Sequence, residues 1–261
     1  MRVKEIADLI ESFAPLAWQE HYDNAGLIVG RYDDEVNRIL LAVDVTEEVL
    51  DEAEREGCDM IISHHPIIFH PLKRLNSATY VERCVERAIR RGIALYACHT
   101  NLDSAPDGMS WRLAQILGLE RCELLENSVK GEGVGFGVVG ELPEGVEPIA
   151  WLRQVKERLS LGVIRHSEPV TNVVRRVALC TGAGASLIGE ARRAGADLYL
   201  TADLKYNDFM TPDKALMVAD IGHFESEYCA IDILFDILSK KISTFALLKS
   251  AVTRTPIRYL C

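Results

Sequence analysis

Residues 36–63 read VNRILLAVDVTEEVLDEAEREGCDMIIS and carry the pattern of one βαβ unit. The apolar runs at 38–45 and 60–63 are short and bounded by polar residues, which is typical of buried strands. Between them, Thr46 stands before two glutamates at a helix start, and Gly57 follows the helix end. A buried strand, a helix and a second buried strand predict an α/β fold.

The same pattern returns 138 residues later as VRRVALCTGAGASLIGEARRAGADLYLT, at 174–201. The two segments align without a gap, and eight of the 28 aligned positions are identical. Two independent βαβ units can converge on such a pattern. However, both copies keep glycine at the helix end and aspartate before the second strand, and this favours an internal duplication.

The rest of the chain extends the two units. An apolar strand predicted at 93–98 has a weaker counterpart within 214–222, and the glycine-rich residues 128–145 are expected to hold the crossing between the units. We therefore expect two related α/β domains. Residues 1–127 with 213–261 would form a metal-binding domain, and residues 128–212 would form the second domain, which carries the second copy.

Composition limits the class of protein. The 261 residues are 48% hydrophobic and carry a net charge of −10, which argues against a broad nucleic-acid surface and disfavours a DNA-associated regulator. The first amphipathic helix carries acids, unlike a targeting peptide, and no apolar run reaches the length of a membrane span. None of the seven cysteines forms a Cys-x-x-Cys pair. We expect a cytoplasmic protein that binds neither membrane nor nucleic acid.

Side chains of the types that bind metals follow three predicted strands, at 60–63, 93–98 and 215–221. They are His64 and His65, then His99 and Asp103, then His223 and Glu227. Ligands of open α/β sheets bind outside the carboxyl ends of the strands, so we expect these side chains on one rim. The last two are four residues apart at a helix start and therefore share one helix face.

Each residue also has an ordinary structural interpretation. A pair of histidines often lies in a turn, a His–Glu pair at this spacing is often a salt bridge, and Asp103 can cap a helix. The three strand ends together favour a metal site. Imidazole and carboxylate without thiolate suit zinc, iron, manganese, nickel or cobalt. Five ligands exceed the three of a catalytic zinc, so we expect two divalent ions per chain, bridged by Asp103 or Glu227.

Several longer segments extend this pattern along the chain: YDNAGLIVG at 22–30, SHHPIIFHPLK at 63–73, HTNLDSAPDG at 99–108, GADLYLTADLKYND at 195–208 and DIGHFESE at 220–227. Together they resemble the GTP cyclohydrolase I type 2 homolog family, also called the Nif-three-like family. The resemblance implies two interlinked α/β domains, a metal pair in the cleft and a toroidal homohexamer. It maps the ligands onto His64, His65, Asp103, His223 and Glu227. It also places His99 near the metals, where we expect this residue either to support a ligand or to transfer a proton.

The resemblance also implies an activity. It would be a dinuclear-metal-dependent hydrolase, in which metal-activated water attacks a nucleotide or related small substrate. The family's named reaction is ring opening of GTP. The alternative is a non-enzymatic metal-binding, metal-chaperone or scaffold protein.

Within 201–207 the chain departs from the usual family pattern, and Ala202 and Asp203 stand in the places of His64 and His65. We expect this second copy to lack the ligands and to serve assembly or substrate, and His70 to be a bystander.

Overall fold

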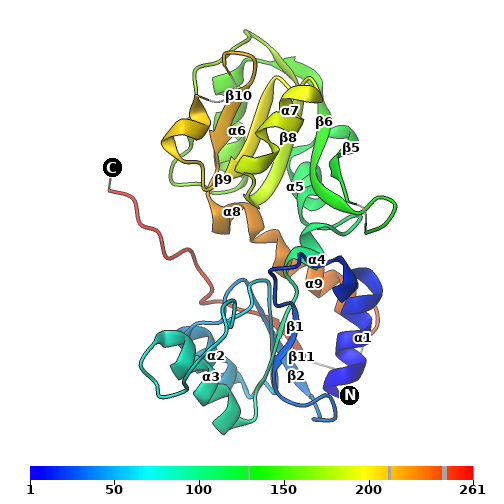
Figure 1. Cartoon of the computed structure of the whole chain (residues 1–261), viewed down its shortest axis with the longest axis vertical. Helices are drawn as coiled ribbons and strands as arrows, with labels where there is room; N and C mark the ends of the chain where they lie inside the picture. Colours follow the sequence, from blue (N-terminus) through cyan, green and yellow to red (C-terminus); the bar gives the residue numbers. More distant parts are fainter. Residues whose placement is uncertain (129, 211–212, 243–245, 261) are drawn as a thin grey trace. The chain divides into compact units, whose positions relative to one another are not determined.

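The computed structural model describes residues 1–128, 130–210, 213–242 and 246–260. They form two compact units, Met1–Leu102 with Ala230–Arg254 and Asp103–Cys229 with Thr255–Cys261, so the chain enters each unit twice (Figure 1). The predicted boundaries need correction, because residues 103–127, 213–229 and 255–260 belong to the second unit. The physical reason is strand pairing, which places the strands at 120–127 and 217–220 in the second sheet.

The first unit is built around a five-stranded sheet with the order β1-β4-β3-β2-β11. Its strands are β1 (Gly26–Val29), β2 (Arg38–Ala42), β3 (Met60–Ser63), β4 (Ala94–Ala97) and β11 (Ala246–Lys249). Only β1 runs antiparallel to its neighbour. The further elements are α1 (Val3–Phe13), η1 (Leu16–Trp18), α2 (Glu47–Glu56), α3 (Tyr80–Arg91), α4 (Thr100–Asp103) and α9 (Cys229–Ser239), of which α4 and α9 reach the unit boundary.

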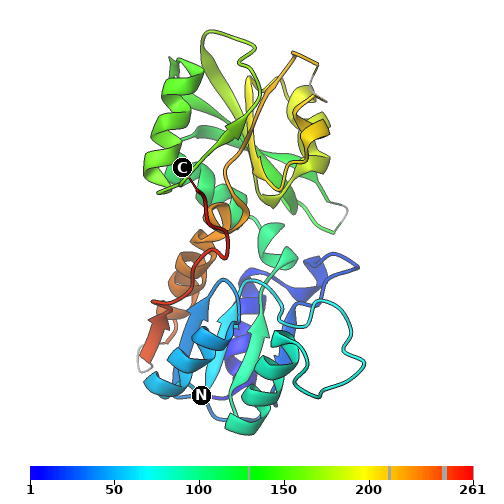
Figure 2. The ribbon, with the colours of Figure 1, turned by 90° about the vertical axis from the view of Figure 1, so that its left-hand side faces the viewer.

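Local chemistry explains these helices. The Thr46 side chain accepts a hydrogen bond from the backbone N–H of Val49 at the start of α2, and Gly57 ends the helix, as predicted. Helices α2 and α3 cover one face of the sheet and α1 covers the other (Figures 1 and 2). The apolar side of α2 packs with alternate strand residues such as Leu40 and Ile61. No helix in the described part of the chain is long and apolar enough to cross a membrane.

The second unit holds a six-stranded sheet with the order β5-β6-β8-β9-β10-β7. Its strands are β5 (Glu120–Asn127), β6 (Gly135–Val146), β7 (Arg165–His166), β8 (Val174–Ala183), β9 (Leu198–Ala202) and β10 (Met217–Asp220). Helices α5 (Met109–Leu117) and α6 (Pro148–Arg158) pack on one face, and α7 (Ile188–Arg193) packs on the other. The shorter helical segments are η2 (Ala185–Leu187), η3 (Tyr206–Phe209) and α8 (His223–Glu227).

The two copies of the βαβ unit share one strand register. Leu40 pairs with Ile61 in the first copy. The residues that lie 138 positions later, Ala178 and Tyr199, pair with each other in the second copy. The aspartates before the second strands have the same contacts. Asp59 accepts hydrogen bonds from two successive backbone N–H groups at 2.7 and 3.1 Å, and Asp197 does the same at 2.8 and 2.9 Å. The register and these contacts support the duplication.

The two aspartates are expected to contribute measurably to stability. Asp59→Ala and Asp197→Ala should each lower the free energy of unfolding by about 1–3 kcal/mol, because each leaves two backbone donors without their charged acceptor. Urea unfolding measures this. Asp33→Ala is the control, since the Asp33 side chain is 83% exposed and forms only a surface ion pair. Equal stability of the control and the Asp197→Ala protein would contradict the prediction.

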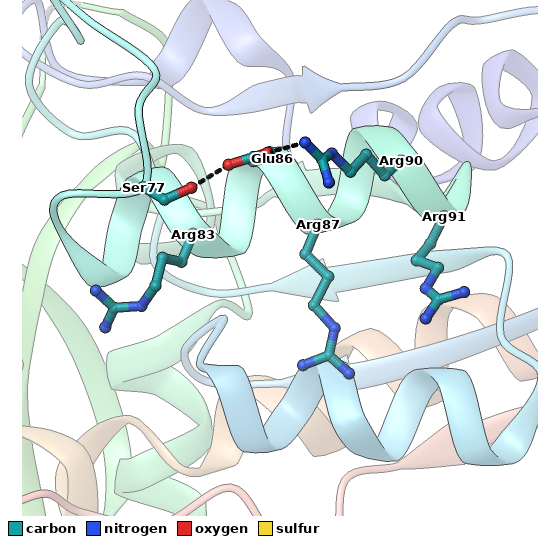
Figure 3. A pocket seen from close by; sticks show the side chains of 6 residues that line it. All are labelled: Ser77, Arg83, Glu86, Arg87, Arg90 and Arg91. Carbon is teal, nitrogen blue, oxygen red and sulfur yellow. Dashed lines mark hydrogen bonds and ion pairs between the residues drawn. The ribbon is translucent and has the colours of Figure 1, made fainter.

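A cavity of about 510 Å³ lies beside α3 and is lined by Ser77, Arg83, Glu86, Arg87, Arg90 and Arg91 (Figure 3). Its four arginines do not create an anion site, because each one is paired with an acid. Three of them reach acidic residues of α2, and Arg90 pairs with Glu86 on α3 itself. The arrangement therefore fastens α3 to α2 through charge pairs and holds no unbalanced positive charge for a ligand.

Candidate metal centre

Three histidines of the first unit gather at one edge of its sheet. His64 and His65 directly follow β3, and His99 follows the adjacent parallel strand β4. Their ligand nitrogens all lie within 4.8 Å of one another, and their ring centroids are 4.9–5.4 Å apart. His64 is fully buried, and the other two are partly buried. This group can bind a metal ion.

Each of these imidazoles is oriented through its Nδ1 atom. His64 Nδ1 lies 2.8 Å from the carbonyl oxygen of Cys98, which can only accept, so Nδ1 carries the hydrogen. His65 Nδ1 lies 2.8 Å from Asp44, and His99 Nδ1 lies 2.7 Å from Asp23. With the proton on Nδ1, the ring nitrogen that can act as a metal ligand is Nε2. Histidine ligands typically donate their other N–H to an oxygen partner of this kind.

The second unit carries further candidate ligands. His223 and Glu227 are the first and last residues of α8, and the distance from His223 Nε2 to Glu227 Oε2 is 3.0 Å. Carboxylate oxygens of Asp103 and Glu227 lie within 4.8 Å of each other. The three predicted strands do not share one sheet: β3 and β4 belong to the first sheet, whereas β10 pairs with β9 in the second.

The predicted helix after β10 also differs from the structure. It divides into α8 and α9, and its first turn, α8, holds both His223 and Glu227. His70, predicted as a bystander, is exposed and lies outside the histidine group, with its ring 5.1 Å from that of Phe69. The segments that would carry ligands are therefore the end of β3 and the short helices α4 and α8.

Three aspartates behind the histidines were missed by the sequence analysis. Asp203 occupies the place of His65 in the second copy, and its Oδ2 atom lies 2.8 Å from His223 Nδ1. It therefore orients a candidate ligand. The sequence predicted only assembly or substrate contacts for this loop. Asp23 and Asp44 do the same for His99 and His65. Their distance along the chain hid these pairings, although Asp44 does stand at the end of a predicted strand.

The glycine-rich segment TGAGAS, at 181–186, accommodates Glu227. Gly182 has a φ of +63°, and a Cβ atom there would lie 2.1 Å from Glu227 Oε1. Its backbone N–H donates to Ser226 Oγ at 2.9 Å. Only glycine combines this backbone conformation with so close an approach. The segment runs from the end of β8 into η2, and it leaves room for a carboxylate of the candidate centre.

Neighbouring charges and hydrogen bonds set the protonation states of His223 and Asp23. Burial lowers the pKa of His223, but hydrogen bonds and charge from Glu227 and Asp203 outweigh burial and raise it to about 9. Burial raises the pKa of Asp23, but hydrogen bonds from His99 and Thr100 outweigh it and lower the pKa to about 2. Asp23 is therefore ionised at neutral pH, and metal-free His223 is protonated.

This pairing predicts a pH dependence of the metal-free protein. The pKa of His223 is about 9 in the folded state, against an ordinary value of 6.5. Its stabilising contribution is thus fully present below pH 6.5 and is lost as the pH rises through 9. In chelator, the melting temperature should fall across this window, and the fall should be smaller for Asp203→Asn. Equal falls for the two proteins would contradict the prediction.

The fold and these side chains define a class: two-unit α/β proteins with histidine and carboxylate groups able to bind metal ions. The chain belongs to the Duf34/NIF3 (NGG1p interacting factor 3) family, whose model matches residues 1–256. This confirms the predicted family.

Individual relatives agree with this assignment. A GTP cyclohydrolase 1 type 2 homolog from Clostridium perfringens is 34% identical over 230 residues, which cover 87% of each chain. NIF3-like protein 1 from Drosophila melanogaster is 30% identical over 207 residues, covering 77% of this chain and 69% of its own. The crystal structure of a Staphylococcus aureus hypothetical protein is similar with a TM-score of 0.92 and 25% identity, covering 100% of this chain and 99% of that one.

Proposed function

We propose that this protein is a metal-dependent hydrolase acting on a nucleotide or a related small substrate. Two divalent ions per chain would take His64, His65, Asp103, His223 and Glu227 as ligands. The observation that carries the proposal is the group of three histidines whose Nδ1 atoms all face oxygen acceptors, because this makes Nε2 the ligand atom of His64 and His65 and the proton-accepting atom of His99. The reaction class comes from relatives named GTP cyclohydrolase 1 type 2 homologs.

The ions would lower the pKa of water toward about 7 and polarise the substrate. His99 would move the proton. Its Nδ1–H is held by the ionised carboxylate of Asp23 at 2.7 Å, so its Nε2 atom can accept a proton and Asp23 can stabilise the resulting imidazolium. The Asp23 side chain is 0% exposed, which strengthens this electrostatic support.

His99 also belongs to the histidine group, and one substitution separates a proton-transfer role from a ligand role. His99→Ala is expected to lower turnover by about 100-fold or more while bound metal changes less than twofold. His65→Ala should lower both quantities together. The measurements are metal content and turnover of the same preparations. Loss of metal in the His99→Ala protein would instead make His99 a ligand.

A second candidate function is a non-enzymatic metal-binding or scaffold protein. The family description, which names an interacting factor, favours this candidate. We further propose that copies of the chain assemble, as the homohexamer expected from the family resemblance. Light scattering coupled to size-exclusion chromatography measures the mass directly, and a monomer of 29.1 kDa would contradict the assembly.

Metal analysis with a substrate screen tests the main proposal. Purified protein is stripped with chelator and reloaded with zinc, iron, manganese, nickel or cobalt. Hydrolysis of GTP and of simpler phosphoester and amide substrates is then followed. We expect two ions per chain at saturation and turnover that depends on them. One ion per chain would contradict the dinuclear centre, and full metal loading without turnover on any substrate would favour the scaffold function.

A further inference from the structure

Two neighbouring exposed aromatic side chains of the first unit extend from His99: Phe69 lies beside it, and Tyr22 lies beside Phe69. The Phe69 ring centroid lies 6.0 Å from that of His99, with the ring planes at 82°, and the Tyr22 ring lies 6.4 Å from Phe69 at 66°. Phe69 is 39% exposed and Tyr22 is 56% exposed. Large aromatic side chains gain free energy when they leave water, so two neighbouring exposed rings beside a candidate catalytic residue indicate a binding surface.

The segments that carry these rings are fixed to the histidine group. Asp23, next to Tyr22, accepts hydrogen bonds from His99 Nδ1 and from the backbone N–H of Thr100 at 3.0 Å. The Asn24 side chain donates to the carbonyl oxygen of Ile68, the neighbour of Phe69, at 2.7 Å. Each ring thus stands directly next to an anchored residue. A ligand that stacks here would find its contacts already ordered, which lowers the entropic cost of binding.

Strand pairing places both segments at the histidine edge of the sheet. Gly26, the first residue of β1, pairs with Ala97, the last residue of β4, and His99 follows β4 two residues later. Residues 22–25 therefore lie beside the carboxyl end of β4. Phe69 comes from the loop that begins with His64 and His65 after β3. The rings flank the strand ends, where ligands of α/β sheets bind.

We propose that Tyr22 and Phe69 form a stacking site for the planar aromatic or heteroaromatic ring of a small ligand. This inference rests on the proposed function and specifies it: the substrate carries such a ring, and the ring binds beside His99. Stacking on an aromatic side chain contributes about 1–3 kcal/mol per base and tolerates different bases. The site would therefore select for a ring and leave the choice among rings to other contacts.

Binding of ring-containing probes tests the stacking site. The purified full-length protein is titrated with guanosine, adenosine and uridine, and with ribose 5-phosphate as a probe without an aromatic ring. We expect the nucleosides to bind and ribose 5-phosphate not to compete. Phe69→Ala and Tyr22→Ala should each weaken nucleoside binding by about tenfold, which corresponds to about 1.4 kcal/mol. Tyr32→Ala is the matched control, because Tyr32 is 45% exposed but lies beyond the opposite end of β1.

Three results would overturn the stacking site. The first is equal nucleoside binding by wild type and Phe69→Ala. The second is that wild type binds no nucleoside. The third is a change of oligomeric mass in the variants without a change in nucleoside binding. The last would mean that a second copy of the chain covers these rings. Metal content is measured in every sample. Nucleoside binding that depends on Phe69 without any metal-dependent turnover would contradict the proposed function alone. Metal-dependent turnover with unchanged nucleoside binding in Phe69→Ala would contradict the stacking site alone.

Discussion

Replacing His64 by alanine is expected to lower the metal bound by the purified protein at least tenfold. The fully buried imidazole is held at Nδ1 by the Cys98 carbonyl group, so its Nε2 atom has a fixed direction. The fold should survive. Loss of the ring leaves a small cavity and removes a donor from Cys98, and together these cost about 1–3 kcal/mol.

Metal content by mass spectrometry and the melting temperature are measured on the same sample. His70→Ala is the matched control, because His70 lies on the same loop but is exposed and outside the histidine group. It should keep the wild-type metal content. If His64→Ala does not fold, His65→Ala replaces it, since that side chain is 24% exposed and its removal disturbs packing less. Wild-type metal content in both variants would contradict the assignment.

The sequence predicts the local parts of this fold well. The strand at 60–63 and the Thr46 and Gly57 ends of α2 follow from short-range chemistry, namely an apolar run and helix caps. The sequence does not predict in the same way which sheet a strand joins, because that depends on partner strands far away in the chain. The apolar run at 217–220 was therefore recognised as a strand but assigned to the wrong unit.

The candidate site divides in the same way. Ligand-type residues after strand ends can be found from the sequence, because the strand gives the position and the side chain gives the chemistry. The aspartates that orient the histidines cannot be found from the sequence. Asp23 is 76 residues away from His99, and Asp203 is 20 residues away from His223, so only the folded chain brings each pair together. Polar strand β5, with glutamates along an exposed edge, was missed because it lacks an apolar pattern.

The duplication explains how the two copies differ at equivalent positions. Asp44 and His65 form a carboxylate–imidazole pair in the first copy. The aligned residues of the second copy are Gly182 and Asp203, and there Asp203 supports His223 while Gly182 leaves space for Glu227. The second copy thus keeps a carboxylate–imidazole pair but takes the imidazole from α8. Gly182 is then required for two reasons, its backbone conformation and the close carboxylate.

Alanine at position 182 separates these two reasons when it is compared with alanine at position 195. Gly195 has a φ of +70°, close to the +63° of Gly182, but nothing lies within 4 Å of the place where its Cβ atom would stand. Gly195→Ala should therefore show only the cost of the left-handed conformation, about 1–2 kcal/mol, and keep its metal. Gly182→Ala has the same backbone cost and must also displace the Glu227 carboxylate.

We expect Gly182→Ala to lower the free energy of unfolding by about 3 kcal/mol or more and to lower bound metal at least tenfold. Urea unfolding of the metal-free proteins gives the first quantity, and metal titration gives the second. The difference between the two alanine variants isolates the contact with Glu227, because their backbone strain is matched. Equal stability and equal metal binding of the two variants would mean that Glu227 moves aside freely and that its position beside Gly182 does not support the centre.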